Sequence, residues 1–289
     1  MKQFKLYSLA LSLLGLGFIM SCNELTEVEP TPAYIHVDEI NLSTTPEQGS
    51  NSHKILDAWL FAESQLIGVF ELPFTAPVLV DGTTEVEIFA GVADNGISSF
   101  REVYPYYARF RVTKELAAGR VDTITPTVNY DNRTEFKFIE TFESSNIFGD
   151  DIDGSSETRI ELWQAEAFEG NRSGRIQLDG NASFFEAGTS NFYELPIDEI
   201  SNPIYLELNY KNDVAFEIGI AGIINGQREN TIYVVGVNPR EEWNKIYIDL
   251  TDSAIQLDAD FYQITLRALL PSGESAADIF IDNVKLLHL

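Results

Sequence analysis

Short segments in which apolar and polar residues alternate recur along this chain of 289 residues, and the clearest are 204–210, 245–250 and 263–268. Successive side chains of a strand point to opposite faces, so such alternation predicts strands with one face against a core. Gly, Pro, Asn and Asp, which favour turns, separate the segments. The pattern therefore predicts an all-β protein.

A first block of strands is expected over 34–128. Segments 58–61 and 66–70 predict a hairpin around a short polar turn, and more strands follow toward residue 127. Several short strands at close spacing are typical of a small β-sandwich.

A second block is expected over 135–289, after a polar linker at 129–134 that follows Pro126. Its eight alternating segments predict a jelly roll of two stacked sheets. The segments are 159–163, 174–178, 204–210, 215–220, 232–235, 245–250, 263–268 and 278–281.

The start of the chain has the pattern of a secretory signal over 1–21. Lys2 and Lys5 precede an apolar run at 6–20, which is shorter than the roughly 20 residues that a transmembrane helix needs. Ser21 then precedes Cys22, the single cysteine of the chain. An ordinary signal peptide with a free cysteine and an uncleaved anchor are the alternatives.

The Ser21-Cys22 pair after the apolar run resembles a bacterial lipobox of the kind found in lipoproteins of the Bacteroidota. The resemblance implies an acyl lipid and diacylglycerol on Cys22 and an outer-membrane lipoprotein exposed at the cell surface. The polar tether 22–33 contains Glu24 and Glu27, which match the surface-export signal of such proteins. A generic solvated linker explains the same residues.

Acidic residues dominate the charge of the chain. It has 19 Lys+Arg and 45 Asp+Glu, and removal of Lys2 and Lys5 with the signal leaves 17 minus 45, or −28. A charge of this sign repels nucleic acid, so no nucleic-acid partner is expected.

The first block carries the segments 57–61, 67–73 and 79–82, which resemble the hairpin and Gly turn of prealbumin-like or PEGA-like surface modules. This resemblance implies a spacer or docking fold. Tyr104, Tyr106 and Tyr107 in the same block could stack a sugar or a peptide, or they could be ordinary strand packing.

The second block opens with Phe142-Glu143 and closes with Ile281-Asp282-Asn283-Val284, with segments 173–178 and 243–250 between them. This order is similar to the galactose-binding-like jelly rolls, which include carbohydrate-binding modules. The resemblance implies a structural Ca²⁺ held by Glu143 and Asp282, with backbone carbonyls completing the six to eight oxygens that calcium requires. Solvated acids at strand ends are the alternative.

Trp163 is the best candidate for ligand contact. If Ile160 and Leu162 face the core, Trp163 faces outward beside Gln164 and Arg172, where it could stack on a sugar ring. A sheet-edge or interdomain contact is the alternative.

No catalytic motif is evident. The histidines His36, His53 and His288 lack metal-site spacing, and neither Gly-x-Ser-x-Gly nor a P-loop occurs. The expected function is therefore that of a non-catalytic surface lipoprotein whose jelly roll binds an extracellular ligand, chiefly a glycan. A docking subunit of an adhesion, gliding or secretion assembly is the alternative, and a cryptic hydrolase is a third hypothesis.

Overall fold

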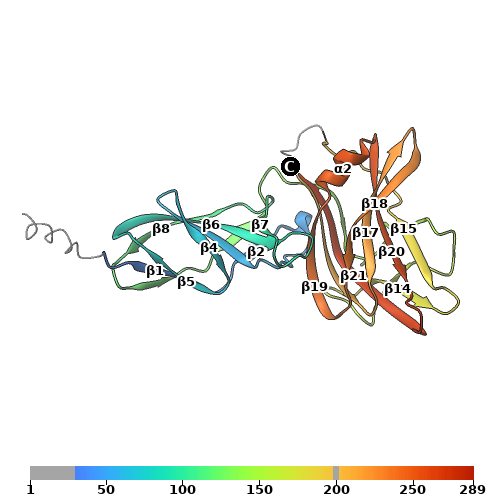
Figure 1. Ribbon diagram of the computed structural model, residues 1–289, viewed down its shortest axis with the longest axis horizontal. Coiled ribbons are helices and arrows are strands. Elements are labelled where there is room, and N and C mark those ends of the chain that lie inside the picture. Colours follow the sequence, from blue (N-terminus) through green and yellow to red (C-terminus); the bar gives the residue numbers. More distant parts are fainter. Residues whose placement is uncertain (1–29, 198–201) are drawn as a thin grey trace, which may run out of the picture.

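The computed structural model describes residues 30–197 and 202–289 (Figure 1). Cys22, the signal 1–21 and most of the tether lie outside the described residues. Strands dominate these residues, alongside a short 3-10 helix, η1 (Pro46–Gln48), and one α-helix, α2 (Thr251–Leu257). None of their helices has the length and apolar character to cross a membrane.

The first block stacks a five-stranded sheet on two smaller sheets. Strands follow the order β4-β3-β6-β7 in the larger sheet, with β8 also paired to β6, while β5-β1-β9 and β10-β2 form the smaller ones. Apolar side chains from both layers make one core. The strands are β1 (Ala33–Val37), β2 (Asn41–Ser43), β3 (Asp57–Ala62), β4 (Gln65–Glu71), β5 (Phe74–Val78), β6 (Gly82–Ala93), β7 (Arg101–Val103), β8 (Phe110–Leu116), β9 (Val121–Thr123) and β10 (Thr127–Asn129).

The second block is a sandwich of a six-stranded and a five-stranded sheet. The first has the order β13-β14-β21-β16-β19, with β11 paired to β21, and the second has the order β12-β15-β20-β17-β18. The strands are β11 (Glu135–Glu140), β12 (Asp150–Asp151), β13 (Ile160–Trp163), β14 (Ser173–Asp179), β15 (Phe184–Gly188), β16 (Ile204–Asn212), β17 (Phe216–Ile224), β18 (Gln227–Val237), β19 (Arg240–Asp249), β20 (Phe261–Leu269) and β21 (Ala276–His288).

Alternation decides which residues fill the core of this sandwich. Ile204, Leu206 and Leu208 of β16 are fully buried in it, together with Ile218 and Ile264 from the opposite sheet. Burial of such side chains contributes about 1.5–3 kcal/mol each. The all-β prediction is confirmed, and both blocks consist of stacked sheets.

The two blocks meet at the six-stranded sheet. Figure 1 shows the first block end-on against the sandwich, with β19 and β21 nearest to it. Every sheet of the described residues draws its strands from one block, and an isolated bridge between Asp94 and Tyr247 crosses the junction. The expected linker 129–134 takes part in the packing, because Tyr130 is buried and Asp131 N donates to Tyr106 O at 2.7 Å.

Candidate functional site

The face of the six-stranded sheet that points away from the sandwich core, here called the outer face, carries polar and aromatic side chains. On β16, Tyr205, Glu207 and Asn209 alternate with the core residues, and Trp163 of β13 occupies the same face at the other edge of the sheet. The first block covers one part of this face, and another part is open.

Tyrosines from the first block fill the covered part. Tyr104 and Tyr106 are fully buried, and the Tyr104 ring lies 5.4 Å from that of Tyr205 and 4.7 Å from that of Tyr247. Tyr107 donates to, or accepts from, the Tyr247 hydroxyl at 3.1 Å. These aromatics therefore form the interface between the blocks and are not a ligand platform.

A buried charge network underlies the tyrosines. Glu207 has no exposed surface, and its carboxylate accepts hydrogen bonds from the hydroxyls of Tyr104 at 2.8 Å and Tyr130 at 2.9 Å. Burial raises the pKa of Glu207, but Lys245 and Lys285 more than offset this, so its pKa is lowered. Burial lowers the pKa of Lys285 to about 8.

A pocket of about 470 Å³ lies at the edge of the open part, where β13 ends. Leu162, Trp163, Gln164, Ala165 and Arg172 line it, so all three predicted ligand residues lie together. Trp163 ends β13 and faces Ser173 of β14, while Ile160 and Leu162 pack toward the core. The loop 164–172 between the two strands supplies Gln164 and Arg172.

Two arginines order this pocket. The guanidinium carbon of Arg175 lies 4.1 Å from the ring centroid of Trp163, and Arg175 makes two hydrogen bonds of 2.9 Å to Asp278. In the amide orientation that satisfies both groups, Gln164 accepts from Arg172 Nε at 3.3 Å. Arg175 was missed from the sequence, although its position on the outward register of β14 could have indicated it.

Glu143 and Asp282 both hold the loop 164–172. Glu143 Oε1 accepts from the backbone N–H groups of Asn171 at 2.6 Å and Arg172 at 3.1 Å, which lower the pKa of Glu143. The Asp282 carboxylate accepts from the backbone N–H groups of Phe168 and Glu169 at 3.1 and 3.2 Å. Burial raises the pKa of Asp282 to about 6.

The remaining oxygens of these two acids also make hydrogen bonds. Glu143 Oε2 accepts from Asn171 Nδ2 at 3.3 Å, and Asp282 Oδ1 accepts from Asn283 N at 2.8 Å. Calcium requires six to eight oxygen ligands, and each of these four carboxylate oxygens already accepts at least one N–H group. The calcium ion therefore stays a prediction from the sequence, and both carboxylates have a role in holding the loop without it.

Within 30–197 and 202–289, one group of three acids brings its carboxylate oxygens within 4.8 Å of one another: Asp94, Glu102 and Asp249. It joins the two blocks, since Asp94 and Glu102 come from the first and Asp249 from the second. Burial, with the charges of Asp249 and Glu102, raises the pKa of Asp94 to about 6. Asp94 and Asp249 are 155 positions apart, so the sequence alone does not indicate that these acids meet.

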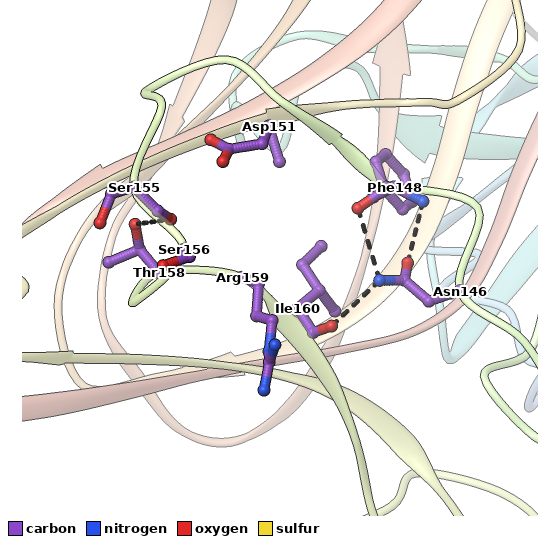
Figure 2. Close-up of a pocket in the computed structure, with 10 residues that line it drawn as sticks. Asn146, Phe148, Asp151, Ser155, Ser156, Thr158, Arg159 and Ile160 are labelled. Carbon is purple, nitrogen blue, oxygen red and sulfur yellow. Dashed lines mark hydrogen bonds between the residues drawn. The ribbon is translucent and has the colours of Figure 1, made fainter.

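A different pocket, of about 220 Å³, lies among loops at the edge of the sandwich (Figure 2). Figure 2 shows the Asn146 amide held by Phe148 and Ile160, with Nδ2 donating to Ile160 O at 3.0 Å. Thr158 donates to Asp153 at 3.1 Å, so these polar groups hold the loops together. The one aromatic ring of its lining, Phe148, is buried, so the pocket lacks a surface for stacking a sugar.

No protein-family model matches the chain, and no curated protein matches it. Among solved structures, the family 22 carbohydrate-binding module of Clostridium thermocellum Xyn10B is 15% identical, covering 54% of this chain and 96% of that chain, with a TM-score of 0.38. Carbohydrate-binding modules from the β-sandwich superfamily are 12% identical over 80% of this chain and 84% of that chain, with a TM-score of 0.38. A family 30 carbohydrate-binding module is 13% identical, covering 54% of this chain and 88% of that chain, with a TM-score of 0.42. Similarity at this level supports no inference about ligand or activity.

Proposed function

We propose that this chain is a non-catalytic glycan-binding protein whose ligand docks in the open pocket of the outer face. The observation that carries the proposal is the assembly of Trp163, Gln164 and Arg172 around one pocket of about 470 Å³. That volume is within the range of roughly 300–1,000 Å³ that small-molecule sites occupy.

The chemistry of the three side chains suits a sugar. The indole of Trp163 offers an apolar surface to the C–H face of a ring, and Arg175 on the ring limits its movement. The Gln164 amide and the Arg172 guanidinium can donate hydrogen bonds to ring hydroxyls. Glu143 fixes the backbone of Arg172, so the polar side of the pocket is ordered before a ligand arrives.

Binding to a panel of soluble polysaccharides by affinity gel electrophoresis tests this function. Trp163→Ala should weaken binding by roughly 2 kcal/mol, which is about thirtyfold. The matched control is Phe184→Ala, which removes a 40% exposed aromatic from β15 in the other sheet and should leave binding unchanged. Equal mobility of wild type and Trp163→Ala in every polysaccharide that retards the wild type would refute the site.

The proposal places the protein at the cell surface through a lipid on Cys22, which the lipobox resemblance supports. Cys22→Ser should abolish labelling by a radioactive fatty acid and release the protein from membranes. Retention of the variant on membranes without label would contradict the lipoprotein proposal and leave the glycan site untouched.

A further inference from the structure

A separate pocket of about 220 Å³ lies where segment 50–54 of the first block meets the outer face of the six-stranded sheet. We propose that this seam pocket binds a single sugar unit that carries a carboxylate, such as a uronic acid. The proposal rests on the proposed glycan binding and adds a second site with its own ligand class. The residues that carry it are Lys54, Phe168, Asn209, Trp243 and Lys245.

Both blocks build the seam pocket, and hydrogen bonds hold them in place. Asn209 Nδ2 donates to Ser52 Oγ at 2.8 Å, and the backbone N–H of Lys54 donates to the Tyr247 hydroxyl at 2.9 Å. Lys285 Nζ donates to Ser50 O at 2.7 Å. The segment 50–54 is thus attached to the sheet at three points, and a ligand meets a formed site.

An aromatic pair forms the apolar wall of the seam pocket. The rings of Phe168 and Trp243 are T-shaped, with centroids 5.8 Å apart, and Phe168 is 39% exposed. Trp243 Nε1 donates to Glu166 Oε1 at 2.7 Å, and Lys211 Nζ donates to the other oxygen of Glu166 at 2.8 Å. The indole N–H is therefore satisfied, and its ring surface remains available for the C–H face of a sugar.

Asn209 gives the wall a polar group that lacks a partner. Its side chain lines the seam pocket and is 1% exposed, yet Oδ1 has no hydrogen-bond partner among the described residues. A buried acceptor without a partner costs about 1–3 kcal/mol. A hydroxyl donated by a bound sugar would satisfy it.

Positive charge in the seam pocket selects an acidic sugar. Lys54 and Lys245 both line it, and the one carboxylate of the described residues within 4.0 Å of either ammonium is Glu207, which lies 2.8 Å from Lys245. Lys54 Nζ instead donates to the neutral Asn244 Oδ1 at 2.7 Å. In a chain with a net charge of −26, a lysine without an acidic partner at an aromatic pocket indicates an anionic ligand.

The volume of the seam pocket limits the size of the ligand. It is smaller than the roughly 300–1,000 Å³ of sites for drug-sized molecules, so it has room for one ring with its carboxylate.

Isothermal titration of the purified full-length chain with D-glucuronic acid tests the proposal. D-Glucose is the matched ligand control, because it differs at C6 in having an alcohol where glucuronate has a carboxylate. We expect glucuronate to bind at least about tenfold more tightly than glucose, and Lys54→Gln to remove that preference. Lys114→Gln on β8 of the first block, outside the seam pocket, is the control substitution and should preserve it.

The two proposed sites fail in different ways. Trp163→Ala should leave the glucuronate preference intact, and Lys54→Gln should leave polysaccharide retardation intact. A preference that survives Lys54→Gln, equal binding of the two sugars, or no glucuronate binding up to about 10 mM overturns the seam pocket. Loss of retardation in Trp163→Ala would still support the open pocket in each of these cases.

Discussion

The covered and open parts of the outer face are made from the same alternating strands, and they differ in what lies over them. In the covered part, Tyr205, Glu207 and Tyr247 are fully desolvated by tyrosines of the first block. In the open part, Trp163 and Arg172 line a pocket, and Arg175 pairs with Asp278 at its edge. The comparison teaches that an outward polar residue of this sheet can be buried between the blocks or can line a pocket. Whether the first block packs over it decides which.

The largest loss of stability is expected from a substitution in the buried charge network of the covered part. Glu207→Ala leaves Lys245 and Lys285 buried with no carboxylate between them, and removing one member of a buried ion pair costs about 3–5 kcal/mol. The midpoint of urea unfolding should fall accordingly. Trp163→Ala, the matched change on the open part, should lower the free energy of unfolding by less than about 1 kcal/mol.

Tyr104→Phe is a milder change in the same network, because it removes one hydrogen bond to Glu207 and keeps the aromatic ring. We expect a loss of about 1 kcal/mol. If Glu207→Ala and Trp163→Ala shift the midpoint equally, the two parts of the outer face do not differ as described.

A smaller and pH-dependent effect is expected at the junction. The pKa of Asp94 is about 6 in the folded chain against 3.8 as its ordinary value, so the folded state favours the protonated acid. The resulting stability is present below about pH 4 and is lost as the pH rises through 6.

Asp94→Asn should therefore match the wild type near pH 4 and exceed it above pH 7. A shift of about two units corresponds to about 3 kcal/mol, and partial exposure of the group reduces the expected gain to about 1 kcal/mol. Melting curves across pH measure the difference, with Asp252→Asn at an exposed position of α2 as the control. If the stability difference between Asp94→Asn and the wild type did not change with pH, the raised pKa of Asp94 would be contradicted.

The smallest effect on stability is expected from calcium at Glu143 and Asp282, the acids that hold the loop 164–172. Because every oxygen of the two carboxylates accepts an N–H group, we expect similar melting temperatures in calcium and in chelator. Glu143→Gln and Asp282→Asn should each lower the melting temperature in both conditions. If calcium at a hundredfold excess over its Kd instead raised the free energy of unfolding by up to about 2.7 kcal/mol, and both variants lost this gain, the result would support the ion predicted from the sequence.

The sequence by itself determined the strands and the direction of their side chains. Alternation through Ile160 and Leu162 predicts that Trp163 faces outward, because strand geometry is local. The pairing of β13 with β14 through the loop 164–172 then brings Gln164 and Arg172 beside it. Period and turns predicted eight strands of the second block and missed β11, β12 and β15.

Only the tertiary structure decided what covers each outward residue. Tyr104 could be read as ligand-binding or as packing until its contact with Glu207, 103 positions away, was known. Asn209 meets Ser52 across 157 positions, and Glu143 meets Arg172 across 29. Such pairs follow no period in the sequence, because they form when separate folded segments pack against each other. The shape and charge of the whole surfaces determine how those segments pack.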